Sequence, residues 1–162
     1  MKSTKIRAGS ARYASLKTEG TYHGKLYYDT GELHYEGQIQ EAIPANKPCG
    51  KGIKYFKNCQ IEMEGFFGDW FIEWGKEYYK NGNLRFEGYY NSGQRSYYGP
   101  RYFTAGKLYY ESGELWYEGT FDVKRNGSLG IPVFRAPEAF KEGTEYTQDG
   151  KIIKQYGYEI IT

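Results

Sequence analysis

A segment of 14 residues recurs along the chain, with a glycine at the start of every copy. Three copies are very similar: GKLYYDTGELHYEG from Gly24, GKEYYKNGNLRFEG from Gly75 and GKLYYESGELWYEG from Gly106. A divergent copy, GIKYFKNCQIEMEG, begins at Gly52, and a fifth, GTEYTQDGKIIKQY, begins at Gly143 and loses the pattern in its second half. A repeat of this kind is one supersecondary unit that buries its apolar face on its neighbours. The chain is therefore predicted to be an array of stacked units.

Each copy has the pattern of a β-hairpin, in which two strands are joined by a tight turn. The turn dipeptides are Thr30-Gly31, Asn58-Cys59, Asn81-Gly82, Ser112-Gly113 and Asp149-Gly150. Asn-Gly and Asp-Gly pairs are the strongest short-range signal for a two-residue turn with positive φ. In the first copy this turn pairs Tyr28 with Leu33, Tyr27 with His34, Leu26 with Tyr35, Lys25 with Glu36 and Gly24 with Gly37. The same register places lysine opposite glutamate in later copies, and its facing glycines allow a neighbouring ring or backbone to approach closely.

Strand alternation sorts the side chains of each copy into two faces. The predicted core face carries Tyr28, Leu33, Tyr35 and Ile39, then Phe56, Ile61, Met63 and Phe67, then Tyr79, Leu84, Phe86 and Tyr90, then Tyr110, Leu115, Tyr117 and Phe121. The opposite face is predicted to carry a constant column of Tyr27, Tyr55, Tyr78 and Tyr109 beside a variable column of His34, Glu62, Arg85 and Trp116. A regular ladder of rings next to four different chemistries is a surface that can discriminate between partners.

The chain resembles a known repeat family in the segments YYDTGELHYEGQI, YYKNGNLRFEGYY and YYESGELWYEGTF. These segments share the run Tyr-Tyr-x-x-Gly-x-Leu-x-aromatic-Glu-Gly-x-aromatic, which is similar to the variant branch of the MORN (membrane occupation and recognition nexus) repeats over most of residues 16–158. The resemblance implies an all-β fold of serial antiparallel β-hairpins that form an elongated, twisted single-layer sheet. It also implies a role in protein contacts without catalytic residues, and its bacterial branch includes the antitoxin component of a toxin–antitoxin module.

The repeats predict the organisation of the 162 residues. Residues 1–15 form a basic leader, and residues 16–162 form the repeat domain. This domain comprises a half-unit at 16–22, units that start near 24, 52, 75 and 106, and a degenerate capping unit at 143–158. The insertions between units, at 40–51, 91–105 and 122–142, are predicted loops, with a short strand at IPVF and one helical turn at PEAF in the last of them.

Composition excludes several function classes. The net charge of +2 is too small to indicate nucleic-acid binding, and no apolar run has the length of a membrane span. The two histidines, His23 and His34, lie in no spacing typical of a metal site, and the glycines form no phosphate-binding loop. The two cysteines are too few for a disulfide scaffold and are expected to be reduced. We expect no metal, no cofactor and no catalytic residue, and we expect a cytoplasmic location because the N-terminus lacks a signal-peptide core.

The sequence leaves three functions open. The favoured one is a non-enzymatic protein-binding module whose partner is a toxin or other effector that it neutralises. Its predicted partner-binding residues are Tyr27, His34, Tyr55, Tyr78, Arg85, Tyr109 and Trp116. The second is a peripheral membrane or polyanion-binding module, in which basic residues of the leader and insertions meet phosphates. The third is a structural repeat that self-assembles, for which the exposed strand edges of an open array offer a route to homo-oligomers.

Overall fold

The computed structural model describes residues 20–42, 45–68, 71–91, 102–122, 124–126, 131–133 and 136–157. The leader and most of the predicted half-unit at 16–22 lie outside these ranges, as does most of the insertion at 91–105. Contacts divide the chain into two compact units, and the division falls after Ile72. We describe each unit by itself.

The first unit is an open antiparallel sheet of four strands in sequence order. The strands are β1 (Thr21–Tyr27), β2 (Leu33–Gln40), β3 (Lys47–Tyr55) and β4 (Ile61–Gly68). The hairpin β1–β2 contains the predicted unit that starts at Gly24, and β3–β4 contains the unit that starts at Gly52. Strand β3 begins at Lys47, so the second half of the insertion predicted as a loop at 40–51 is part of the sheet.

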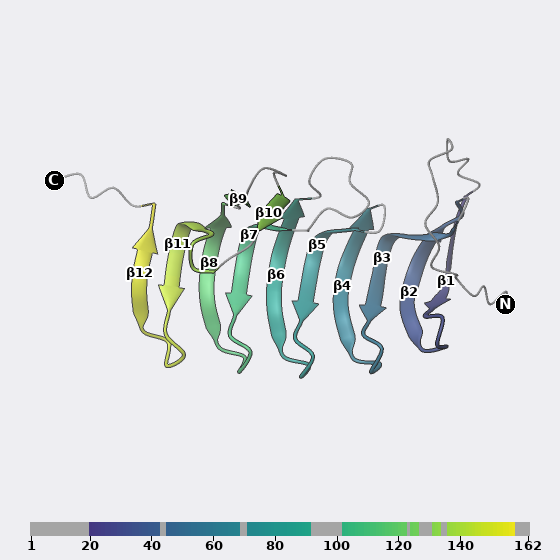
Figure 1. Ribbon diagram of the computed structural model, residues 1–162, viewed down its shortest axis with the longest axis horizontal. Coiled ribbons are helices and arrows are strands. Elements are labelled where there is room, and N and C mark those ends of the chain that lie inside the picture. The colour runs from purple at the N-terminus through teal and green to yellow at the C-terminus, as the bar shows by residue number, and fades with distance from the viewer. Residues whose placement is uncertain are drawn as a thin grey trace. The chain divides into compact units, whose positions relative to one another are not determined.

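The second unit repeats this plan with six strands in one layer (Figure 1). They are β5 (Phe71–Tyr78), β6 (Leu84–Asn91), β7 (Tyr102–Tyr109), β8 (Leu115–Phe121), β11 (Phe140–Tyr146) and β12 (Ile152–Tyr156). A separate two-stranded sheet, β9 (Lys124–Asn126) and β10 (Ile131–Val133), interrupts the sequence between β8 and β11 and confirms the short strand predicted at IPVF. None of the described ranges contains a helix, and the segment at PEAF forms a turn in which Phe140 N donates to Pro137 O at 2.9 Å.

The all-β class and the serial antiparallel hairpins in a single layer are therefore confirmed. The five turns also lie where the dipeptides predicted them, but their type differs. In the first, Gly31 N donates to Tyr28 O and Tyr28 N donates to Glu32 O, both at 2.9 Å, so that three residues rather than two form the loop. The same pair of bonds closes the other four loops. The third loop residue takes positive φ, as a type I turn followed by a left-handed residue requires.

The register also shifts by one residue on the turn side of every hairpin. In the first hairpin Leu26 lies opposite Tyr35 as predicted, but Tyr27 lies opposite Leu33, so the predicted pairings of Tyr27 with His34 and of Tyr28 with Leu33 are wrong. The equivalent shift occurs in all five hairpins. A bulge of this kind adds one residue to one strand and redirects its side chain. The extra residues are His34, Glu62, Arg85, Trp116 and Ile153.

Beyond the bulge the predicted register is confirmed, and it builds a row of glycines across each unit. Glycines face one another within hairpins and also between them, as in Gly88 opposite Gly106. The row accommodates aromatic rings: a Cβ on Gly52 would lie 2.0 Å from the hydroxyl of Tyr35, and one on Gly106 would lie 2.8 Å from the tip of Phe86. The glycines are thus required because rings lie directly against the backbone.

The core consists of these rings and their neighbours on the same face. Eight of the residues predicted for it are buried: Tyr35, Ile39, Met63, Phe67, Phe86, Tyr90, Tyr117 and Phe121. The structure adds Leu26, Phe103, Leu108, Ala139 and Phe140. Four predicted members, Leu33, Ile61, Leu84 and Leu115, instead lie opposite the tyrosine column because of the bulge.

Candidate functional site

Each unit presents two faces, and we name them by the rows that define them. The inner face carries the buried rings, including Tyr35 in the first unit and Phe86 and Tyr117 in the second. The outer face carries the lysine–glutamate row, in which Lys25 opposes Glu36 with a distance of 3.3 Å between Nζ and Oε1. Since the two columns of predicted partner-binding residues were assigned to one face, their actual positions decide what the site can be.

The tyrosine column lies on the outer face. Tyr109 donates its hydroxyl to Glu87 Oε1 at 3.2 Å, and Tyr146, at the equivalent position of the last hairpin, donates to Glu118 Oε1 at 2.6 Å. Both glutamates belong to the lysine–glutamate row. Burial, followed by the Glu87 carboxylate, raises the pKa of Tyr109 to about 12, so the phenol stays protonated and donating at neutral pH. Tyr109 is thus a partly exposed ring whose orientation is fixed by a hydrogen bond, and Tyr27, Tyr55 and Tyr78 are also partly exposed.

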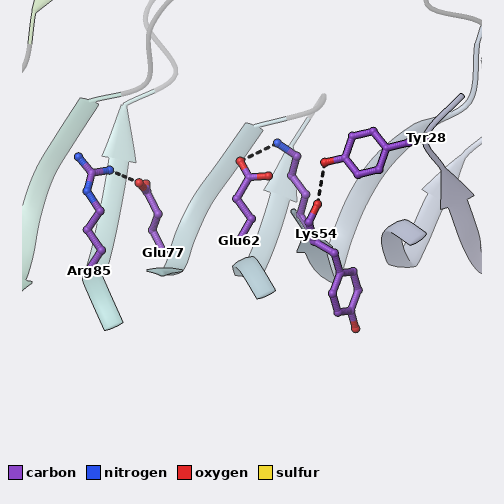
Figure 2. A network of polar contacts seen from close by, with 6 residues as sticks. Tyr28, Lys54, Glu62, Glu77 and Arg85 are labelled. Carbon is purple, nitrogen blue, oxygen red and sulfur yellow. Dashed lines mark hydrogen bonds and ion pairs between the residues drawn. The ribbon is translucent and has the colours of Figure 1, made fainter. Parts of the chain in front are cut away.

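The variable column, by contrast, lies on the inner face, because the bulge redirects it. Glu62 forms an ion pair with Lys54 at 2.9 Å, and Lys54 lies opposite the core residue Met63. Arg85 forms an ion pair with Glu77, which lies opposite Phe86. Figure 2 shows both ion pairs, one in each unit. The prediction that the two columns share one face is wrong.

The remaining two members of the variable column pack on aromatic rings. The His34 ring lies 4.3 Å from the ring of Tyr28, and Trp116 stacks on Tyr110 with 5.0 Å between centroids and an interplanar angle of 14°. Trp116 also contacts the edge of Phe140 at 5.7 Å and donates its indole N–H to Glu145 Oε1 at 3.2 Å. Trp116 is therefore a structural contact of the core, and not the exposed anchor that the sequence suggested.

The environment of His34 favours its neutral form. Burial lowers its pKa to about 4, and the nearby Lys54 ammonium acts in the same direction, while the Glu62 carboxylate opposes both. At neutral pH this imidazole is uncharged. The neighbouring Glu62 carboxylate is already paired with the Lys54 ammonium.

A second set of tyrosines ties consecutive hairpins together. Tyr28 donates its hydroxyl to the backbone oxygen of Tyr55 at 2.7 Å, which Figure 2 also shows. Tyr79 donates to Tyr109 O and Tyr110 donates to Tyr146 O, both at 2.8 Å. Each bond joins the second tyrosine of a Tyr-Tyr pair to the equivalent first position of the next hairpin. The repeated Tyr-Tyr dipeptide was the sequence signal for this contact.

Three aromatic residues that were not predicted to bind a partner, Phe66, Trp74 and Tyr89, are more than half exposed. Trp74 on β5 and Tyr89 on β6 lie directly opposite each other, with 52% and 59% of their surfaces exposed. They flank the glycine pair Gly75 and Gly88 on the outer face, because side chains alternate along a strand. The sequence signal was an aromatic residue immediately before Gly75 and another immediately after Gly88, just outside the 14-residue repeat.

A shallow groove of about 690 Å³ lies on the same outer face of the second unit. Its floor is the glycine row at Gly106, Gly119 and Gly143. It is lined further by Ala105, Lys107, Glu118, Thr120, Glu142, Thr144, Tyr156 and Gly157. None of the buried inner-face rings lines it, which is consistent with a groove on the opposite side of the sheet.

Several other predicted binding residues and segments lie partly outside the described residues. The basic residues proposed to meet phosphates in the leader and at Arg95, Arg101 and Arg135 lie outside the described residues, and Lys124 and Arg125 are described only as part of β9. Within the described ranges, no group of three histidine, cysteine or acidic residues is placed to hold a metal ion. Cys49 and Cys59 are free thiols, as predicted. The described residues contain no helix with the length and apolarity needed to cross a membrane.

Comparison with known proteins does not extend this description. A scan of family models gives no match to the chain, and searches of curated proteins and of solved structures give none either.

Proposed function

We propose that the chain is a non-enzymatic protein-binding repeat module that uses the outer face of its hairpins. The observation that supports this most directly is the tyrosine column, whose rings stand half-exposed on an open sheet face. Tyr109 is held there by its bond to Glu87. Rings that are already oriented lose little conformational entropy on binding and contribute large contact areas, which is why tyrosine is common at protein interfaces.

A toxin or effector is the first class of partner to test. The resemblance to the antitoxin-type branch of the MORN repeats supports this choice, and an antitoxin needs only to cover a surface of its target. Of the predicted partner-binding residues, the outer-face tyrosines Tyr27, Tyr55, Tyr78 and Tyr109 keep this role in the proposal. His34, Arg85 and Trp116 have inner-face contacts that account for them as structural residues.

The outer face gives less support to binding of polyanions. Its central row alternates in sign across the second unit, with Lys76, Glu87, Lys107 and Glu118 as successive cross-strand partners. A phosphate-rich surface would be attracted by the lysines and repelled by the glutamates next to them. Self-assembly through sheet edges is the remaining alternative, and the mass of the protein in solution distinguishes it.

The test is capture of the native partner by tagged protein in the cells of origin, followed by calorimetry with the purified pair. Tyr78→Ala combined with Tyr109→Ala should weaken binding by about 2 kcal/mol or more if these rings are anchors. Tyr109→Phe is the matched control, because it keeps the ring and removes only the hydroxyl bond. Unchanged binding by the double variant, or an unpartnered wild-type chain that only self-associates, would refute the proposal.

A further inference from the structure

The outer face of the second unit has one place where large rings are left uncovered. Trp74 and Tyr89 are each more than half exposed and stand opposite each other on β5 and β6. Directly opposed residues on one face have Cβ atoms about 5 Å apart, so the two rings form a single apolar platform. Trp and Tyr are the side chains most often found as binding anchors.

The groove begins where this platform ends. Tyr89 lies opposite Ala105 on β7, and Ala105 lies opposite Thr120 on β8. Along this cross-strand row, two large rings are therefore followed by two small side chains. The floor behind these small residues is the glycine row. A ligand that lies across the strands can therefore place one bulky side chain on the platform and continue along the groove without a steric barrier.

The charged residues that line the groove are Lys107, Glu118 and Glu142. Lys107 lies between Glu87 and Glu118 in the lysine–glutamate row, whereas Glu142 on β11 is exposed and lies opposite the neutral Thr120. Glu142 therefore continues the row of Tyr89, Ala105 and Thr120, and because strands lie about 4.8 Å apart, it is about 14 Å from Tyr89 across the sheet. An extended peptide rises about 3.3 Å per residue, so this distance corresponds to about four residues.

We propose that this surface binds an extended segment of a partner protein, with an apolar side chain on Trp74 and Tyr89 and a basic side chain about four residues away at Glu142. This inference rests on the proposed function and names the surface and the chemistry of the partner. Carboxylates beside the rings favour a peptide that carries an apolar and a basic side chain. A neutral polysaccharide gains nothing from these charges, and an anionic membrane is repelled by Glu118 and Glu142.

The test begins with a phage-displayed library of random short peptides panned on the full-length chain. The enriched peptides should share an apolar residue and a basic residue about four positions away from it. Trp74→Ser with Tyr89→Ser should weaken binding of a synthetic enriched peptide by about 30-fold, the equivalent of a typical anchor. Ile152→Ser with Ile153→Ser is the matched control, because it removes two exposed apolar side chains of the same unit on β12 and should leave the affinity unchanged.

A charge swap tests the orientation of the segment. Glu142→Lys should weaken binding of the peptide, and a peptide whose basic residue is replaced by glutamate should bind this variant better than it binds the wild type. Circular dichroism melts establish that each variant is folded. The inference is overturned if panning enriches no such pattern, if the Trp74 and Tyr89 variant binds normally, or if that variant loses binding to cellohexaose or to phosphatidylserine vesicles instead.

The native partner separates this inference from the function on which it rests. If the wild-type chain captures a protein and the Trp74 and Tyr89 variant captures it equally well, the protein-binding function stands and this surface is wrong. If the wild-type chain captures no protein, the proposed function fails, and the inference fails with it.

Discussion

The loop of the second hairpin contains a residue in a conformation that disfavours it, and its replacement should stabilise the protein. Cys59 has φ of 65°, and it is the one non-glycine residue with positive φ in the described ranges. The equivalent positions in the other four loops are glycines, among them Gly31 and Gly82. We therefore predict that Cys59→Gly raises the free energy of unfolding.

The magnitude follows from two opposing effects. A residue with a Cβ in the left-handed region costs roughly 1–2 kcal/mol. Glycine also increases the conformational entropy of the unfolded chain, which offsets about 0.4–1 kcal/mol of the gain from removing this strain. Packing contributes little, since Cys59 is exposed and a Cβ at the equivalent Gly31 or Gly150 would have no neighbour within 4 Å. The expected net gain is about 0.5–1 kcal/mol, or a rise in Tm of roughly 1–4 °C for a chain of this length.

The assay is urea denaturation followed by far-UV circular dichroism under reducing conditions. The midpoint should rise while the slope stays constant, because the surface exposed on unfolding does not change. Hydrogen exchange localises the effect, and protection should increase in β3 and β4 of the first unit. Gly82→Ala is the reverse control and should destabilise the second unit by a similar amount. A Cys59→Gly variant with equal or lower stability would refute the reasoning that the left-handed position carries strain.

Three further predictions concern single side chains. Tyr79→Phe removes the hydroxyl bond to Tyr109 O and should cost about 0.5–1.5 kcal/mol in a urea titration, whereas no loss would mean that the bond does not tie the hairpins. The pKa of His34 is about 6.5 in the unfolded chain and about 4 in the folded protein, so the free energy of unfolding should fall as the pH drops from 6.5 to 4. His34→Gln should remove that part of the loss, and equal pH profiles for the variant and the wild type would contradict this prediction. Thr120→Val removes a shielded Oγ1 that has no hydrogen-bond partner among the described residues and should stabilise the fold by about 1 kcal/mol, as calorimetric melting would show; destabilisation would indicate a hydrogen bond at that atom.

The repeat pattern predicted most of the architecture because it encodes local geometry. Positions of the turns, the facing glycines and eight core residues all follow from the two-residue period of a strand and the spacing of glycines. The turn type did not follow, because the dipeptides Thr30-Gly31 and Asn81-Gly82 are also the last two residues of a three-residue loop. A dipeptide signal does not distinguish these loops, since both need a left-handed residue at the glycine.

The error in the faces had one physical cause. A single inserted residue moves the side chains on its turn side to the opposite face of the sheet. The two-residue period of a strand does not reveal such an insertion in the sequence. The charges did carry a trace of the bulge. Lys54 and Glu62 are opposite in sign and eight residues apart, and Glu77 and Arg85 have the same spacing with the signs exchanged. Such an exchange indicates that the two positions pair with each other, which in these hairpins requires the bulge.

This pairing also changes the meaning of the variable column. In the first four repeats the bulge residue stands eight positions after an inner-face residue: Leu26 and His34, Lys54 and Glu62, Glu77 and Arg85, Leu108 and Trp116. In these four an ionisable inner-face residue occurs with a residue of opposite charge, and a leucine occurs with an aromatic ring that stays neutral at pH 7. The fifth repeat departs from this pattern, because Ile153 stands eight positions after Glu145. Variation in this column therefore reflects the partner within the same hairpin. A surface for other proteins is better sought on the outer face, where Trp74 and Tyr89 are exposed beside a groove that no side chain of the described core fills.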